Sequence, residues 1–221
     1  YEPRSMSEQV PVVWNRAIGA TVEDADGNWF IDFTSGVLVT NIGHCHPRYV
    51  DEMKKQCEEL YNCYDFVTSW RAMLAKKLVE ITPENLGKAF ILTTGSETIE
   101  AAIKLARRYK DGYEIISFNG SFHGRTYGGM SVGGKMGVKR GFGPTVPGTI
   151  HAYFPYCYRC AYDKTFPECD YWCFQSLDQA VDTQSTGEIA GLITEPYQGG
   201  AGSIIPPPGY LKKLENWCKE H

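Results

Sequence analysis

A strand–turn–helix stretch near the middle of the chain carries residue types that could bind an anion. Residues 90–93 form an apolar, partly β-branched run, which predicts a buried strand, and apolar residues follow at helical spacing from Glu97 onward. The first amides of a helix have no partner within the helix, and the helix dipole favours a negative charge beside them. Gly95 would let the backbone approach a ligand closely, and Ser96 would add a hydroxyl donor. The stretch therefore predicts a phosphate site.

The same stretch also suits an ordinary strand-to-helix turn in which Ser96 caps the helix. Such turns are frequent wherever strands and helices alternate, so the stretch alone does not decide between the two interpretations. Two further loops bear on the choice. Residues 119–126 follow a predicted strand at 113–118, and Glu195 follows another at 189–194. Ligands of open α/β sheets bind at such strand ends.

The elements expected around these loops alternate between strands and helices. Near the N-terminus, Asp26-Gly27 is a favoured turn pair between residues 17–23 and 28–33, which predicts a β-hairpin. The remaining pattern predicts helices at 47–60, from 68 or 69 to 81, from 97, around 177–181 and at 210–219, and strands at 90–93, 113–118, 149–153 and 189–194. Gly-rich residues 128–148 suit a loop or a small-residue helix. This alternation predicts an α/β fold, with a mainly parallel sheet and helices on both faces.

Composition narrows the class of protein. The chain has 221 residues and a net charge of −4, without a cluster of Lys and Arg, so nucleic acid and anionic membranes are not expected as partners. We find no apolar run long enough to span a bilayer and no signal-peptide pattern. Eight cysteines are many, yet a chain of this length without an export signal favours a reducing, cytoplasmic setting.

Four motifs in order resemble the class III, or ω-amino-acid, aminotransferases. They are Gly43-His-Cys-His-Pro, Gly95-Ser-Glu, Phe122-His-Gly-Arg-Thr and Glu195-Pro-Tyr-Gln-Gly-Gly. These enzymes use pyridoxal phosphate on the fold type I scaffold, and 4-aminobutyrate and ornithine aminotransferases are typical members. The resemblance implies that residues 1–50 belong to the small domain, with the hairpin, and that residues 51–221 form the front part of the large cofactor-binding domain. Two histidines flanking Cys45 could suggest a metal site, but a structured loop suits this spacing better.

The resemblance assigns four residues to the cofactor. Gly95 and Ser96 match the positions that bind the phosphate, which agrees with the helix-terminus argument. Phe122 matches the aromatic residue that stacks on the pyridine ring, a role that its flat apolar face suits. His123 matches a residue beside the ring. A core aromatic and a histidine that only supports its neighbours are the alternatives.

Three residues are assigned to the substrate in the same way. Arg125 matches the arginine that binds the distal carboxylate of an ω-amino acid or the side-chain carboxylate of a keto acid. A guanidinium pairs with a carboxylate through two hydrogen bonds, which explains the use of arginine. Glu195 matches a glutamate that pairs with a second arginine and helps to switch between substrates. Val37 matches an apolar position of the pocket. A surface arginine, a solvated carboxylate and a core valine are the respective alternatives.

Two residues that the family needs have no match before His221. They are the lysine that forms the Schiff base with the cofactor and the aspartate that holds the pyridinium nitrogen. The resemblance places both downstream. We therefore expect an N-terminal half that is inactive and binds the cofactor weakly alone, that is completed by a C-terminal half, and that forms a homodimer.

The function implied is transfer of an amino group from an ω-amino acid, such as 4-aminobutyrate, to a 2-keto acid such as 2-oxoglutarate or pyruvate. An amino-acid racemase or epimerase on the same scaffold is an alternative. A non-catalytic metal-binding module is another. Arg125 and Glu195 together favour transamination with a dicarboxylate keto acid.

A cysteine-rich excursion at about residues 155–175 interrupts the alternation. Cys157 and Cys160, followed by Cys169 and Cys173, have nearly the ligand spacing of a zinc or iron–sulfur site. Some relatives carry a similar excursion, and some 4-aminobutyrate aminotransferases bind an iron–sulfur cluster through a Cys-x-x-Cys at a subunit interface. A metal, disulfides and free thiols all remain open from the sequence.

Overall fold

The computed structural model describes residues 10–221, and the chain divides by its internal contacts into two compact units between Glu84 and Asn85. Each unit is described by itself. The assignment of residues 1–50 and 51–221 to a small and a large domain stays a prediction, and its first nine residues lie outside the described part.

The first unit contains a three-stranded antiparallel sheet, ordered β1 (Trp14–Ile18), β2 (Thr21–Asp24) and β3 (Trp29–Ile31). The predicted hairpin is present between β2 and β3. Its turn is closed by Asp24, whose Oδ1 accepts hydrogen bonds from the amides of Asp26 and Asn28 at 3.0 and 2.8 Å. The predicted first strand is divided, because its residues 17 and 18 belong to β1.

Three helices follow in the first unit: α2 (Ser35–Leu38), α3 (Pro47–Glu59) and α4 (Ser69–Ile81). The last two match the predicted helices. Proline opens α3, where its missing N–H costs nothing. Thr68 caps α4, and its Oγ1 accepts a hydrogen bond from the Arg71 amide at 3.3 Å.

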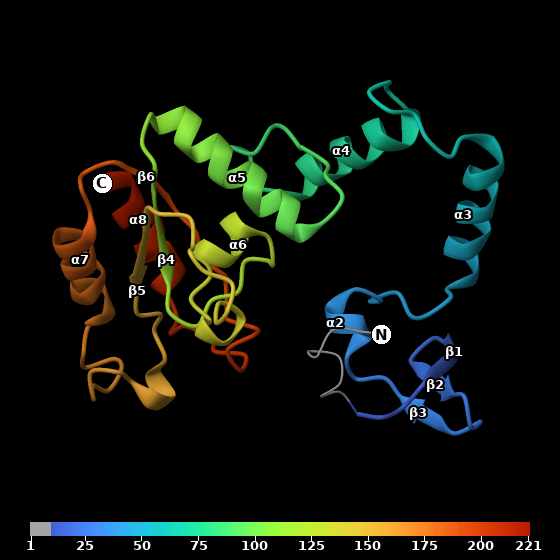
Figure 1. Ribbon diagram of the computed structural model, residues 1–221, viewed down its shortest axis with the longest axis horizontal. Coiled ribbons are helices and arrows are strands. Elements are labelled where there is room, and N and C mark those ends of the chain that lie inside the picture. The colour runs from blue at the N-terminus through green and yellow to red at the C-terminus, as the bar shows by residue number, and fades with distance from the viewer. Residues whose placement is uncertain (1–9) are drawn as a thin grey trace. The chain divides into compact units, whose positions relative to one another are not determined.

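The second unit is built on a parallel sheet with the order β5-β4-β6, which confirms the predicted parallel arrangement (Figure 1). The strands are β4 (Glu114–Phe118), β5 (Thr149–Ala152) and β6 (Ile189–Leu192). The helices are α5 (Gly95–Lys110), α6 (Tyr127–Val132), α7 (Cys173–Gln184) and α8 (Tyr210–Glu220), with the 3₁₀ turns η1 (Met136–Val138) and η2 (Cys157–Arg159).

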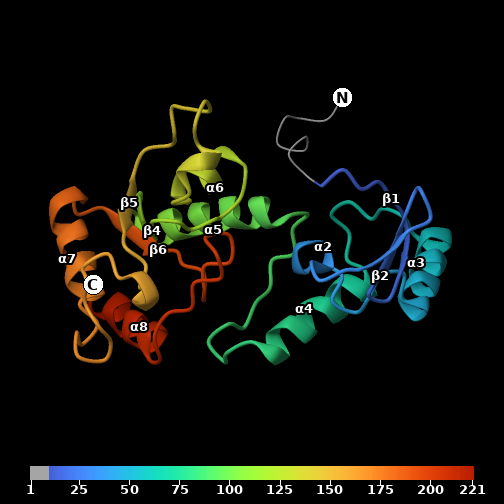
Figure 2. The same cartoon turned by 90° about the horizontal axis from the view of Figure 1, so that it is seen from below.

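Helices cover both faces of this sheet, as the alternation predicts (Figures 1 and 2). Ile116 and Phe118 of β4 pack with α7 and α8 on one face. Ile115 points to the opposite face, where it packs with Ile103 of α5 and Val132, the last residue of α6. The apolar side chains of β4 alternate in this way because successive residues of a strand point to opposite sides.

The predicted strand at residues 90–93 is absent from the described structure, so this prediction is wrong. The segment is irregular, and Phe90 is 74% exposed. A strand needs a neighbouring strand to satisfy its backbone hydrogen bonds, and the three described strands of this sheet do not pair with residues 90–93.

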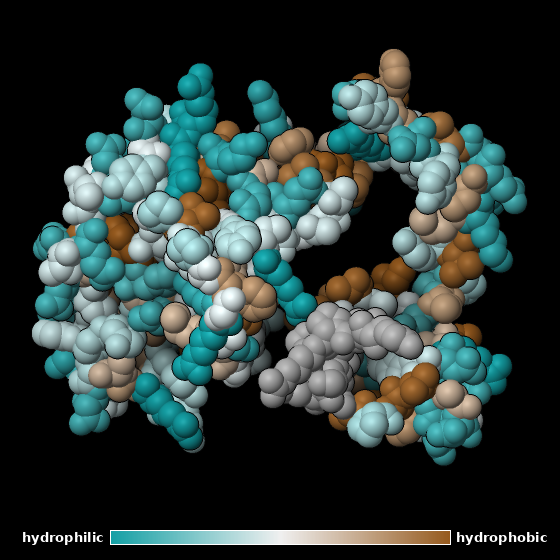
Figure 3. Space-filling model, in the orientation of Figure 1, coloured by the Kyte–Doolittle hydropathy of each residue, from teal (hydrophilic) through white to brown (hydrophobic). Residues whose placement is uncertain are grey.

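Apolar side chains also lie on the surface of both units, and Figure 3 shows them in brown. In the first unit, Phe33 and Val67 are about nine-tenths exposed, while Val22 is only 1% exposed. Exposed apolar surface of this extent is typical of a surface that other protein covers. None of the described helices is long and apolar enough to cross a membrane.

Candidate functional site

The N-terminus of α5 is capped by Thr94, and not by Ser96 as the alternative to a phosphate site supposed. Thr94 Oγ1 accepts a hydrogen bond from the Glu97 amide at 3.1 Å. The Glu97 carboxylate in turn accepts one from the Thr93 amide at 2.8 Å. These contacts resemble a capping box, although the glutamate binds the amide of Thr93, one residue before the N-cap Thr94. The hydroxyl of Ser96 is therefore not needed as the helix cap.

Ser96 contacts the loop that follows β4. Its Oγ accepts a hydrogen bond from the backbone N–H of Arg125 at 3.0 Å, so the hydroxyl proton remains available for another acceptor. A Cβ at Gly95 would meet nothing within 4 Å, so the backbone at the start of α5 is open to a ligand. Open backbone, an oriented hydroxyl and free helix amides suit a phosphate group.

Glu195, just after β6, joins two loops through its side chain. Its Oε2 accepts a hydrogen bond from the Phe122 amide at 3.1 Å, and its Oε1 accepts one from the Gly199 amide at 3.2 Å. Both carboxylate oxygens therefore already have backbone donors. The structure places Glu195 beside the loop of Phe122 and Arg125, where both of its hydrogen-bond partners are amides. Its predicted pairing with a second arginine stays a prediction.

Two residues that sequence reasoning did not assign also fix these loops. The Gln198 side chain, 1% exposed, donates from Nε2 to the Asn119 carbonyl at 2.9 Å. Glu100 on α5 accepts hydrogen bonds from the Gly129 amide, at 3.1 Å, and from the Thr126 hydroxyl. The only signals in the sequence were the place of Gln198 in the last motif and of Glu100 on the predicted helix. Their partners lie 26 to 79 positions away, so the sequence did not indicate them.

His123 is buried, and its Nε2 has no hydrogen-bond partner within the described residues. Burial, with a smaller contribution from the nearby His151, lowers the pKa of His123 to about 4. The imidazole is therefore neutral at pH 7. An unpartnered buried polar atom costs free energy unless a ligand or ordered water satisfies it.

Phe122 and Arg125 are exposed, and within the described ranges Arg125 forms no ion pair. An exposed ring and an unpaired guanidinium on one loop can contact a ligand without first breaking a protein contact. Val37 belongs to the first unit, so its predicted place in the substrate pocket stays a prediction. It is 85% exposed and has a φ of 60°, which is rare for a β-branched residue.

The four clustered cysteines line a single small cavity of about 30 Å³. All four are free thiols, so the structure contains none of the disulfides that the sequence left open. Burial raises the pKa of Cys173 to about 11. In the part of the chain that the structure describes, no group of three His, Cys, Asp or Glu side chains is arranged to hold a metal ion.

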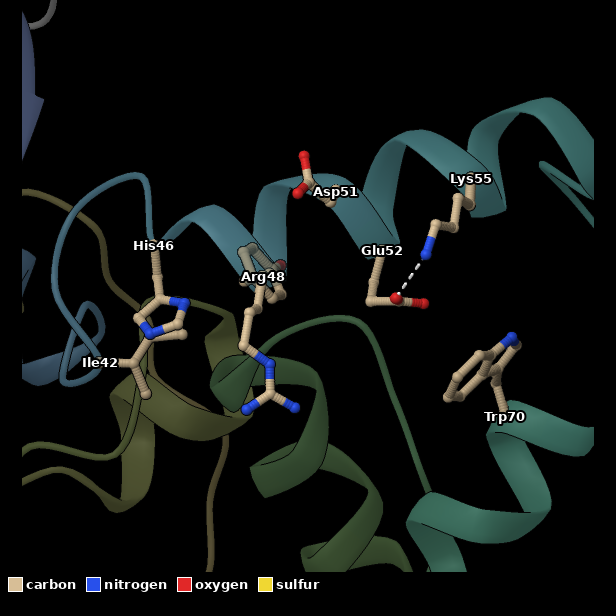
Figure 4. Close-up of a pocket in the computed structure, with 8 residues that line it drawn as sticks. Ile42, His46, Arg48, Asp51, Glu52, Lys55 and Trp70 are labelled. Carbon is tan, nitrogen blue, oxygen red and sulfur yellow. Dashed lines mark hydrogen bonds and ion pairs between the residues drawn. The ribbon is translucent and has the colours of Figure 1, made fainter.

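The first unit contains a larger, open pocket of about 670 Å³, which no motif predicted. Figure 4 shows His46, Arg48 and Glu52 extending from the beginning of α3, with Trp70 facing them from α4. Lys55 pairs with Glu52 at 2.8 Å.

The loop at residues 43–47, which precedes α3, is held by His44. Its Nε2 forms a hydrogen bond with Asp32 Oδ2 at 2.8 Å, which supports the structured loop expected from the sequence.

The family profile "Aminotransferase class-III" matches residues 3–221, so the chain belongs to the class III aminotransferase family. An acetylornithine aminotransferase of Methanopyrus kandleri is 36% identical over 96% of this chain and 49% of its own length. A probable 4-aminobutyrate aminotransferase of Bacillus subtilis is 36% identical over 92% of this chain and 48% of its own length.

Solved transaminases share the fold. An (S)-enantioselective omega-transaminase from Thermomicrobium roseum superposes with a TM-score of 0.91 at 29% identity, over 100% of this chain and 51% of that one. A PLP-bound amine transaminase from an uncultivated Pseudomonas species superposes with a TM-score of 0.89 at 27% identity, over 100% of this chain and 52% of that one. The predicted family and fold class are thereby confirmed, and the chain spans about half the length of the relatives it matches.

Proposed function

We propose that the protein containing this chain is a pyridoxal-phosphate-dependent aminotransferase that acts on an ω-amino acid and a 2-keto acid. The observation that carries the proposal is the convergence of α5, the loop after β4 and the loop after β6. Ser96 bonds to the Arg125 backbone, and Glu195 bonds to the Phe122 backbone. These two hydrogen bonds connect three motifs that lie apart in sequence, which supports one site at the carboxyl ends of the strands.

The residues present suit the cofactor. Gly95 and Ser96 would hold the phosphate through backbone amides and a hydroxyl, and the exposed ring of Phe122 would stack on the pyridine. The orphaned Nε2 of His123 could be satisfied by a ligand or by water beside that ring. Pyridoxal phosphate, when bound, supplies the electron sink that this chemistry needs. The protein's part is to hold and orient the ring.

Arg125 would recognise a substrate carboxylate. Arg125 has no counter-ion in residues 10–221, so its guanidinium is available to form two parallel hydrogen bonds with a carboxylate group. The names of the two relatives, acetylornithine and 4-aminobutyrate aminotransferase, fit an amino group distant from a carboxylate. Glu195 would contribute by holding the loop that carries Phe122, and Val37 would line the pocket as the resemblance implies.

Other features of the whole protein are part of the same proposal. Its relatives are about twice as long, and we propose that a C-terminal half supplies the cofactor-linking lysine and the aspartate. The exposed apolar residues of the first unit support a homodimer, the arrangement the resemblance implies. We propose a cytoplasmic location, which eight free thiols support.

The test uses the natural protein that carries this chain, purified with its cofactor. We expect visible absorbance from bound cofactor and transfer of an amino group from 4-aminobutyrate or acetylornithine to 2-oxoglutarate. Arg125→Lys should raise the KM for the carboxylate substrate by about tenfold or more, because a single ammonium cannot form the paired contact. Racemisation of an amino acid without amino transfer would favour the racemase alternative and overturn the proposal.

A metal at the cysteine cavity is the second candidate. The convergence of Cys157, Cys160, Cys169 and Cys173 on one cavity supports a soft-metal site, whether zinc or an iron–sulfur cluster. The described thiols are not arranged as ligands, so binding would require them to move. Elemental analysis of the purified protein decides this, and a metal content below one tenth of an atom per chain would exclude the site.

A further inference from the structure

The contact between Ser96 and the loop after β4 depends on Gly124. Its φ is +125°, a backbone conformation that favours glycine. A Cβ on Gly124 would lie 2.7 Å from Ser96 Oγ and 3.1 Å from Ser96 Cα. The two backbones therefore approach so closely that a side chain at position 124 would have to displace Ser96.

This close approach determines which way the Ser96 hydroxyl can point. Its oxygen accepts the Arg125 N–H at 3.0 Å, and the helix cap is made by Thr94 instead. A serine hydroxyl has one proton to donate. With one lone pair already bound to the amide, that proton is directed away from the loop.

The loop after β4, which carries the Arg125 amide, is itself held in place by hydrogen bonds. Glu100 accepts hydrogen bonds from the Thr126 hydroxyl and the Gly129 amide, and Glu195 accepts one from the Phe122 amide. The Arg125 amide thus lies between two anchored points. The position of this N–H is therefore set by the loop, and the Ser96 hydroxyl has to orient itself to accept from it.

We propose that Gly124 is a positioning residue, which lets the Arg125 amide orient the Ser96 hydroxyl as a donor to the cofactor phosphate. This inference rests on the proposed function, because it concerns the same phosphate site. Gly124 itself contacts no part of the cofactor in this proposal. Its effect reaches the phosphate through Ser96.

The test compares two ligands that differ only in the phosphate group. Pyridoxal phosphate and pyridoxal are titrated into the natural protein after its cofactor has been removed, and binding is followed by absorbance. Ser96→Ala and Gly124→Ala should each weaken pyridoxal phosphate binding by about 10- to 100-fold, the usual effect of losing a hydrogen bond to a charged group. Binding of pyridoxal should change by less than about threefold.

Gly187→Ala is the matched control for backbone strain. Gly187 also has a positive φ, of +93°, but a Cβ there would meet nothing within 4 Å, and the residue lies outside the site. This variant should carry a similar strain and leave the binding of both ligands unchanged. An equal loss of pyridoxal phosphate binding in Gly187→Ala would overturn the inference.

A double variant separates folding from positioning. Ser96→Gly removes the two side-chain atoms that a Cβ at position 124 would contact too closely. The double variant Ser96→Gly/Gly124→Ala should therefore lose less unfolding free energy, measured in urea, than the sum of the losses in the two single variants. It should still fail to discriminate pyridoxal phosphate from pyridoxal, because the hydroxyl is gone. Recovery of that discrimination would overturn the inference.

The two proposals fail in different ways. If the unaltered protein binds neither ligand, the proposed function is wrong. If it binds pyridoxal phosphate more tightly than pyridoxal, and Gly124→Ala weakens both ligands equally, then the proposed function stands and the positioning role of Gly124 is wrong.

Discussion

The carboxylate of Glu195 holds the backbone of Phe122, since its Oε2 lies 3.1 Å from the Phe122 nitrogen. The two residues are 73 positions apart, and each follows a different strand of the parallel sheet. The other carboxylate oxygen binds the Gly199 amide, so one side chain fixes the loops after β4 and β6 together. The candidate site therefore depends on hydrogen bonds between loops as much as on the residues that would touch a ligand.

Replacing Glu195 tests this connection. In Glu195→Gln one acceptor oxygen becomes an amide NH₂, which faces a backbone N–H instead of binding it. We expect the Phe122 or Gly199 amide to exchange its hydrogen about 5- to 10-fold faster, the effect of about 1 kcal/mol. Hydrogen exchange followed by mass spectrometry measures this.

The control for this exchange experiment is Glu215→Gln on α8. Among the described residues Glu215 pairs with two exposed lysines of its own helix, Lys212 and Lys219, so exchange at the candidate site should not change. Unaltered exchange at both Phe122 and Gly199 in Glu195→Gln would contradict the proposed link between the loops.

Gly134 is expected to tolerate no side chain. A Cβ there would lie 2.0 Å from the Phe118 carbonyl oxygen and 2.7 Å from Asn119 Cα, so backbone would have to move. Gly134→Ala should destabilise the protein by about 3 kcal/mol or more, the upper range for overpacking. Gly137→Ala is the matched control, because a Cβ there meets nothing within 4 Å. Equal urea midpoints for the two variants would refute this assignment.

His123 should make stability depend on pH. Its pKa is lowered from 6.5 to about 4 in the folded protein, so the unfolded state binds a proton first as the pH falls. The stability from this group is fully present above pH 6.5 and is lost between pH 6.5 and 4. We expect this loss to amount to about 1–3 kcal/mol of unfolding free energy.

The measurement for His123 is urea unfolding at pH 7.5 and 4.5. His123→Gln should lose less stability than the unaltered protein over this interval, because glutamine does not titrate. His151 also faces this histidine and has a pKa lowered by burial, so the double variant with His151→Gln should flatten the dependence further. A parallel acid response in all three proteins would show that His123 does not carry the effect.

Leu177 should be a major contributor to the core between the sheet and helices α7 and α8. It is 1% exposed, and truncation to alanine leaves a cavity among packed neighbours. We expect Leu177→Ala to cost about 2–5 kcal/mol of unfolding free energy. Leu211→Ala on α8 is the control, since that side chain is 41% exposed and should cost less than about 1 kcal/mol. Comparable costs would contradict the described packing.

Much of the fold followed from periodicity in the sequence. The apolar runs at β4, β5 and β6 and the helical spacing in α5 and α8 were readable, because burial imposes their patterns locally. The hairpin turn was also readable, because Asp26-Gly27 is a favoured turn pair and Gly27 adopts the positive φ that such turns need. The strand expected at residues 90–93 was not formed, because a strand depends on a partner that its own residues do not specify.

The candidate site was less accessible to sequence reasoning. The motifs indicated Ser96, Phe122, Arg125 and Glu195, and the structure brings them onto connected loops. The partners of those residues were not indicated. Glu195 binds the Phe122 amide across 73 positions, and such a contact depends on how distant segments meet. Thr94 rather than Ser96 caps α5, because two hydroxyl residues compete within the same turn and their types alone do not decide between them.

The sheet order also has a consequence for biosynthesis. Ile115 of β4 pairs with Gly191 of β6, which a ribosome adds 76 positions later. At a synthesis rate of about 5–20 residues per second, the edge of β4 that pairs with β6 has no partner strand for roughly 4–15 seconds. Ile115 and Ile116 belong to the buried core, so a nascent chain exposes them during this interval. Co-translational chaperones are therefore expected to bind the emerging chain most strongly before β6 has left the exit tunnel.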